Sequence, residues 1–188
     1  AAVATAMQNT DVIFTPVSVS ITHSKSVEDA CAAGARIVAL TQFTPELMMG
    51  GGIEADFDAL AVDCRAVAKV LDAGSSMTVT TPAGTDLILD ISGRAGIAKT
   101  CLVEPGEFSP APDIEATVSP ISGEGVVVCD ASIPYLGIGV PDRPVTVTVK
   151  GGKVVSIEGG RAADIVREAW ESMSDPNVYN VAELGIGL

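Results

Sequence analysis

The sequence has few aromatic residues, few positive charges and no long apolar run, and each shortage excludes something. Aromatic residues make up 4%, so a core must be built mainly from Val, Ile, Leu and Ala. With 24 acidic and 11 basic residues the net charge is −13. A field of that sign repels phosphate backbones and anionic lipid surfaces, so we expect neither nucleic acid nor membrane as a partner.

Membrane-spanning and secreted classes are disfavoured by what the apolar segments lack. No apolar run reaches the roughly 20 residues that a bilayer requires. The first residues also lack the basic start and long apolar segment of a signal peptide. We therefore expect a cytoplasmic protein.

Closely spaced cysteine pairs are also missing. A metal site built from cysteines would need such pairs, and the four cysteines are about 30 residues apart. Each lies in an apolar pattern and is expected to be a small buried side chain in a reducing compartment. They are Cys31, Cys64, Cys101 and Cys129.

What is present is 47% apolar residues in a chain of 188, enough for one domain or two small ones. The first 74 residues show patterns of strand and helix in alternation, which predicts a parallel sheet. We expect a strand within 11–19, then a helix capped by Ser26 and ended by Gly34, and then a strand at 36–40. A short helix should follow, with Thr44 as its cap and Pro45 in its first turn. The segment should end with an amphipathic helix over 53–73.

After Gly74 the apolar period changes from helical to two, which predicts strands. Lys150 to Lys153 is expected to form a hairpin turn, and residues 164–173 a final helix. The predicted fold class is therefore α/β: an N-terminal β-α-β-α, Rossmann-like segment over 1–74, followed by a β-rich α+β segment over 75–188.

Nucleophilic catalysis has little support from the residues. The single histidine, His23, precedes a helix start, where it could order the loop or contact a substrate, and both roles stay open. No GxSxG motif is present. The glycines at 50–52 lack the pattern of a phosphate-binding loop and are expected to connect helices.

Two carboxylates stand out because their neighbours are apolar. Glu115 lies in "DIEATV" and Glu183 in "VAELGIGL". A carboxylate in such a setting is costly to desolvate unless it meets a cation or a hydrogen-bond donor. The two acids could share a divalent metal ion, or each could be hydrogen-bonded to backbone or solvent.

Five stretches carry a resemblance to a known group. They are "SITHSKSVEDACAAGARIVAL", "GTDL" followed by a short strand and "GR", the loop "PGEFSPAPDIEATVSP", the hairpin "VTVKGGKVVSIEGG", and "NVAELGIGL". In this order along nearly the whole chain they resemble the thermophilic-type metallo-aminopeptidase superfamily, which also contains the 2,5-dihydroxypyridine dioxygenases.

The resemblance implies roles for both acids. Glu115 matches the metal-binding glutamate of a PxGE motif, with Ile114 in place of its glycine. Glu183 matches the metal-binding glutamate of AELGIG, and the two would be catalytic as ligands, or as a ligand and a base. In the dioxygenases a histidine takes the place of Glu183, so a glutamate here favours the hydrolase branch.

The resemblance implies a metal-dependent hydrolase that uses metal-activated water on a peptide or amide bond, with zinc, cobalt or manganese. The alternatives are an iron-dependent ring-cleaving dioxygenase of the 2,5-dihydroxypyridine type, or a non-catalytic binding member. The substrate would be a small molecule or peptide, and the full-length protein a homodimer.

The family's remaining metal ligands lie after AELGIG, and the sequence stops at Leu188. The chain is thus expected to be a central part of a longer protein. Residues 1–74 would form a partial α/β domain and residues 75–188 a β-rich metal-site domain truncated at its C-terminus. Alone, the chain would bind metal weakly and be inactive, which titration with zinc or manganese tests.

Overall fold

The computed structural model describes residues 2–188, and their contacts divide the chain into two compact units. The first unit comprises Ala1–Lys69, Ile97–Thr117 and Gly185–Leu188, and the second comprises Val70–Gly96 and Val118–Leu184. Each unit combines helices with sheet, which confirms the α/β fold class. The predicted continuous domains, 1–74 and 75–188, stay a prediction; the units themselves are discontinuous in sequence.

The first unit contains the parallel sheet that the alternating patterns predict. Its strand order is β1-β2-β6, with β1 at Val12–Thr15, β2 at Arg36–Ala39 and β6 at Phe108–Pro110. The helices α1 (Ala2–Met7) and α2 (Lys25–Ala32) belong to the same unit. Side chains from both helices and β2 form one buried cluster: Met7, Val27, Ala30, Ala35 and Ile37.

Helix α2 begins earlier than the predicted cap allows. Its N-cap is Ser24, in an extended conformation, and Ser26 lies inside the helix, so the Ser26 cap is wrong. The Ser24 carbonyl already accepts the first helical bond, from Val27 N–H at 3.0 Å. The end of the helix is as expected, because Gly34 has a φ of +98° that a glycine adopts without strain.

The helical segment that follows starts with α3 (Pro45–Met49), where the Thr44 hydroxyl accepts the Leu47 N–H at 3.4 Å as predicted. Helix α4 (Phe57–Ala73) begins later than predicted, because residues 51–54 form the separate 3-10 turn η1 (Gly51–Glu54). The Asp56 carboxylate then accepts the Ala59 N–H at 3.0 Å at the start of α4. Four side chains of the predicted apolar face are buried: Ala61, Cys64, Ala68 and Leu71.

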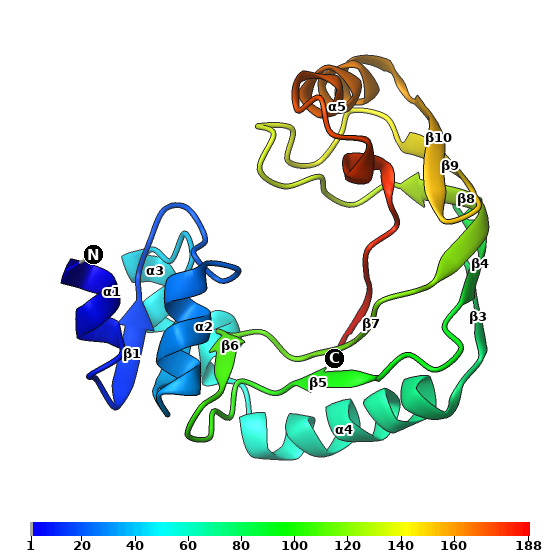
Figure 1. The fold of residues 1–188 in the computed structure, drawn as a ribbon. Coiled ribbons are helices and arrows are strands. Elements are labelled where there is room, and N and C mark those ends of the chain that lie inside the picture. Colours follow the sequence, from blue (N-terminus) through cyan, green and yellow to red (C-terminus); the bar gives the residue numbers. More distant parts are fainter. Residues whose placement is uncertain (1) are drawn as a thin grey trace. The chain divides into compact units, whose positions relative to one another are not determined.

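A second three-stranded sheet has the order β11-β7-β5, with β5 at Ile97–Lys99, β7 at Glu115–Val118 and β11 at Leu184–Gly187. Strands β5 and β7 are antiparallel, and Lys99 pairs with Glu115. Figure 1 shows α4 running alongside β5, and the Cys64 thiol of α4 donates a hydrogen bond to the Lys99 carbonyl at 3.4 Å.

The second unit is built on a five-stranded antiparallel sheet with the order β10-β9-β8-β4-β3. The hairpin between β9 and β10 turns at Gly151–Gly152, as predicted. Helix α5 (Gly160–Ser172) packs on β9 and β10 (Figure 1), and Ala162, Ala163 and Val166 join their buried cluster. The strands are β3 Ser76–Thr80, β4 Asp86–Asp90, β8 Ser122–Cys129, β9 Val145–Lys150 and β10 Lys153–Glu158, and the 3-10 turn η2 spans Pro176–Tyr179.

Within residues 2–188, no helix combines the length and apolarity that crossing a membrane requires.

Candidate functional site

Glu115 is the first residue of β7, and the sheet fixes where its side chain starts. The residues on either side, Ile114 and Ala116, are buried, while Glu115 itself is half-buried. Strand β5 lies on one side, with Lys99 as the residue paired with Glu115. Because successive side chains of a strand point to opposite faces, the Glu115 side chain lies on the face opposite its buried neighbours Ile114 and Ala116.

The Glu115 carboxylate lies against the backbone of Gly185 in β11. A Cβ atom at position 185 would stand 2.6 Å from Cδ of Glu115 and would overlap its Oε1. A real Cβ does not approach that closely, so the carboxylate occupies the space that any other residue at 185 would need. A side chain at position 185 would therefore force the Glu115 carboxylate to move from its present position.

Cys64 and Cys101 are two of the cysteines that were expected from the sequence to be small buried side chains. Cys64 is fully buried, and burial raises the pKa of its thiol above the ordinary value. The pKa of Cys101 is raised by burial and, secondarily, by the negative charge of Asp113. Both thiols are neutral at pH 7. The prediction of a buried side chain is confirmed for Cys64 and wrong for Cys31, Cys101 and Cys129, which are half-buried.

Glu183 immediately precedes β11, belongs to the second unit and is exposed. Its pairing with Glu115 stays a prediction. His23 is exposed in the loop before α2, and its role stays open. Ile114, which replaces a glycine of the family motif, is buried, and its carbonyl accepts the Leu188 N–H at 3.1 Å.

The described residues do not complete a metal site. Within residues 2–188, no three or more His, Cys, Asp and Glu side chains are grouped so that they could hold a metal ion. Carboxylates such as Glu115 suit divalent metals, but one or two of them do not make the four-ligand or facial-triad sets of catalytic metals.

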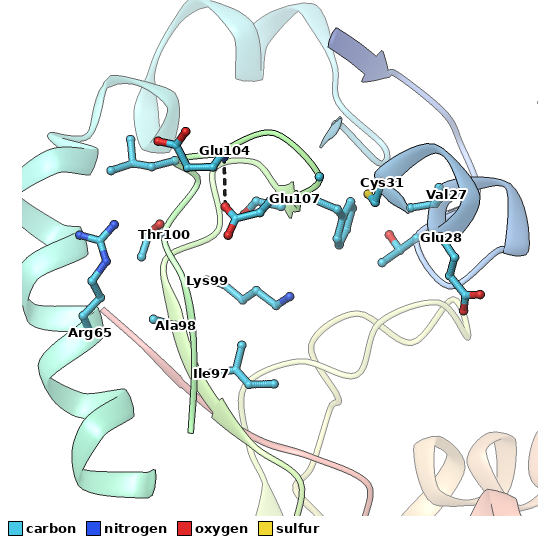
Figure 2. Close-up of a pocket in the computed structure, with 15 residues that line it drawn as sticks. Val27, Glu28, Cys31, Arg65, Ile97, Ala98, Lys99, Thr100, Glu104 and Glu107 are labelled. Atoms are coloured by element: carbon cyan, nitrogen blue, oxygen red, sulfur yellow. Dashed lines mark hydrogen bonds between the residues drawn. The ribbon is translucent and has the colours of Figure 1, made fainter. Parts of the chain in front are cut away.

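A pocket of about 590 Å³ lies in the first unit, and the sequence did not reveal it. Its walls come from α2, β5, one residue of α4 and the loop into β6, segments far apart along the chain (Figure 2). The one signal for it was the proline-containing "PGEFSP" loop, which suggests a ligand-holding segment. Parallel pairing of β6 with β2 carries that loop to α2.

Charged groups line this pocket at defined places. The Lys99 ammonium lies 5.7 Å from the centroid of the Phe108 ring. The Glu107 carboxylate accepts the Glu104 N–H at 3.0 Å, the dashed contact in Figure 2. The Cys31 thiol is also part of the wall, and burial raises its pKa, so it is neutral at pH 7.

Two solved structures share the fold. A 2,5-dihydroxypyridine dioxygenase from Pseudomonas putida KT2440 has a TM-score of 0.79 at 22% identity, covering 98% of this chain and 52% of that one. AmpT from Thermus thermophilus has a TM-score of 0.63 at 15% identity, covering 99% and 57%. The chain therefore has the fold of the superfamily that unites these aminopeptidases and dioxygenases, as the resemblance predicted.

The family within that superfamily follows from the sequence. Residues 1–188 match, over their whole length, the family described as NicX: 2,5-dihydroxypyridine 5,6-dioxygenase, and the chain belongs to this family. None of the curated proteins compared with the chain matches it.

These relationships revise the expected activity. The prediction of the superfamily, whose members are metal-dependent enzymes, is confirmed. The prediction of a hydrolase is not confirmed, because the matching family is that of a dioxygenase. The chain spans about half the length of the solved structures that it matches, 52% and 57%.

Proposed function

We propose that the whole protein is an iron-dependent dioxygenase that cleaves the ring of a dihydroxylated pyridine. The observation that carries this proposal is the match of residues 1–188 to the 2,5-dihydroxypyridine 5,6-dioxygenase family over their entire length. This replaces amide hydrolysis as the leading expectation. The substrate is then a small planar heteroaromatic ring with two oxygen substituents.

Glu115 is the residue of this chain that is best placed to act as a donor in that enzyme. It is half-buried at the start of β7, and its carboxylate is held against Gly185, where no side chain of residue 185 competes for the space. Its position is thus set by backbone on two strands, which is the preorganisation that a ligand or base requires.

Glu183 is the second residue in the proposal. Two extended residues span at most about 7 Å, so chain connectivity keeps the Glu183 α-carbon near that of Gly185. The Glu115 carboxylate in turn lies against Gly185. The role proposed for Glu183 rests on the resemblance, which matches it to a metal-binding glutamate of the superfamily.

Iron with two histidines, one carboxylate and open positions supplies the dioxygen chemistry that ring cleavage needs. The sequence has a single histidine, and it is exposed. The proposal therefore assigns the remaining ligands to parts of the whole protein outside residues 1–188. This agrees with the share of the solved structures that the chain covers.

A hydrolase of the aminopeptidase type is the second candidate, and the observation that favours it is the identity of residue 183. The dioxygenases carry a histidine in the place of Glu183 according to the resemblance, and a carboxylate there suits zinc, cobalt or manganese better than an imidazole-rich iron set.

A non-catalytic binding role is the third candidate, favoured by the incomplete donor set within residues 2–188.

The test uses the whole protein, prepared without oxygen and loaded with Fe(II), and follows oxygen uptake with 2,5-dihydroxypyridine. We expect one oxygen molecule consumed per substrate, with both labelled atoms found in the product by mass spectrometry. Cleavage of leucine p-nitroanilide with zinc, cobalt or manganese and no oxygen uptake would instead establish the hydrolase. Inactivity with every metal and both substrates would favour the binding role.

Variants separate the roles of the two acids. Glu115→Gln and Glu183→Gln should each lower kcat at least about 100-fold, since the loss of a carboxylate at a metal site commonly has such effects. Glu168→Gln, an exposed acid on α5, is the matched control and should leave kcat unchanged. Glu183→His should retain iron-dependent activity if the dioxygenase proposal is right, and should abolish activity in a hydrolase.

A further inference from the structure

The pocket of the first unit has the size of a small-molecule site. Its volume of about 590 Å³ lies within the range typical of ligand pockets. Neither Glu115 nor Glu183 is among its lining residues, although Lys99, which lines it, is the strand partner of Glu115. Four apolar side chains form part of its wall: Val27, Ile97, Leu102 and Phe108.

Two basic residues, Lys99 and Arg65, line this pocket. Figure 2 shows the Lys99 side chain extending from β5 into the pocket. None of the ion pairs found within residues 2–188 involves Lys99. Its contact with a charged or polarisable group is the Phe108 ring, at 5.7 Å from the ammonium to the centroid. That ring stabilises a cation without neutralising it.

Three acids line the same pocket, Glu28, Glu104 and Glu107, and Glu107 is exposed. The Glu107 carboxylate uses Oε2 to accept the Glu104 N–H at 3.0 Å, and no ion pair within residues 2–188 includes it. Glu28, a further acid of the wall, is different, because Lys25 lies 3.6 Å from its carboxylate. Lys99 and Glu107 therefore present opposite charges to one cavity, and the fold does not pair them with each other.

We propose that this pocket binds a small zwitterion with an apolar side chain, such as a free α-amino acid. The ligand's carboxylate is recognised by Lys99, its ammonium by Glu107, and its side chain by the apolar wall. A simple anion would satisfy Lys99 but would be repelled by Glu107, and a simple amine would meet the reverse difficulty. Only a molecule with both charges compensates both residues. This inference does not depend on the activity proposed above.

The test measures binding to residues 1–188 by isothermal titration with EDTA present, so that no metal site takes part. L-leucine is the zwitterion. The matched probes are 4-methylpentanoate, which lacks the ammonium, and 3-methylbutylamine, which lacks the carboxylate. We expect leucine to bind at least about tenfold more tightly than either probe, which corresponds to one charge pair. Amide chemical shifts should change in segments 22–31 and 97–109.

Charge-removing variants make the assignment specific. Lys99→Met and Glu107→Gln should each weaken leucine binding about tenfold or more. In Glu107→Gln, 4-methylpentanoate should bind as well as leucine does, because the repulsion is gone. Lys69→Met and Glu168→Gln remove exposed charges outside the pocket and should leave leucine binding unchanged, with circular dichroism confirming the fold of all four.

The proposal is overturned if 4-methylpentanoate binds the unmodified chain as tightly as leucine, if leucine does not bind at all, or if leucine binding survives both Lys99→Met and Glu107→Gln.

Discussion

Gly185 shows how one residue without a side chain sets the position of a functional one. The Glu115 carboxylate lies where a Cβ of residue 185 would be, whereas a Cβ added to Gly187, two residues further along β11, would have no atom within 4 Å. The two glycines lie in the same strand and differ in this single respect. They therefore form a matched pair for mutation.

Gly185→Ala should displace the Glu115 side chain and lower stability relative to Gly187→Ala. Alanine in a strand is favoured over glycine by roughly 0.5–1 kcal/mol, so Gly187→Ala should be neutral or slightly stabilising. The free energy of unfolding of Gly185→Ala should be about 1 kcal/mol lower than that of Gly187→Ala. In a thermal unfolding experiment this corresponds to a Tm that is roughly 2–4 °C lower.

A double-mutant cycle identifies the cause of that difference. In a Glu115→Ala background the overlap is gone, so Gly185→Ala should have the same effect as Gly187→Ala. If Gly185→Ala remained worse in that background, some atom other than the Glu115 carboxylate would be responsible.

Cys64 gives a second prediction at this scale, on the dependence of stability on pH. Burial raises its pKa above the reference value of 9.0, so the folded state keeps the proton after the unfolded state has lost it. The contribution of the Cys64 thiol to the free energy of unfolding is therefore fully present below pH 9, and it is lost as the pH rises above that value. In urea unfolding between pH 8 and about 10, Cys64→Ala should show a shallower decline than the unmodified chain.

At the scale of elements, the pairing of β8 with β4 depends on Gly125. This residue has a φ of +130°, and a Cβ there would lie 3.0 Å from the Leu87 α-carbon and would overlap the Asp86 carbonyl oxygen. Gly93 also has a positive φ, +66°, but no atom lies within 4 Å of a Cβ built on it. The φ of Gly93 lies in the left-handed helical region that a side chain can adopt at a cost, whereas the φ of Gly125 is nearly restricted to glycine. Gly125 therefore has the larger conformational penalty as well as the closer backbone approach.

Gly93→Ala should therefore lower the free energy of unfolding by about 1–2 kcal/mol, the usual penalty for a positive φ with a side chain. Gly125→Ala should lower it by at least about 2 kcal/mol more, because the strands must separate to admit the methyl group. Equal losses in urea unfolding for the two variants would show that backbone approach in this sheet is not limiting.

The elements were the part of the structure that local sequence predicted well. The strand alternation from Thr78 to Ile91, the Thr44 cap and the apolar face of α4 are all decided by residues within a few positions of each other. The start of α2 was misjudged because Ser24 and Ser26 are both good N-caps, and the turn before the helix, with Ser24 N–H donating to the Ile21 carbonyl at 2.9 Å, decides between them.

For the whole molecule, the net charge of −13 has a measurable consequence. Like charges repel in the compact state more than in the expanded chain, and salt screens this repulsion over about 10 Å at 0.1 M. Raising NaCl from about 10 to 150 mM should therefore raise Tm. A Tm that falls with added salt would mean that attractive ion pairs outweigh the repulsion, and the described pairs, such as Lys25–Asp29, are exposed and few.

The sequence by itself determined the fold class and the superfamily, because period, caps and motif order are local properties of the chain. Its assignment of Glu115 and Glu183 to a site stays a prediction. The tertiary structure alone decided that the "PGEFSP" loop meets α2, that Gly185 accommodates the Glu115 carboxylate, and that Lys99 and Glu107 line one pocket. Those contacts join residues far apart in sequence, and strand pairing between distant segments, which no local pattern encodes, brings them together.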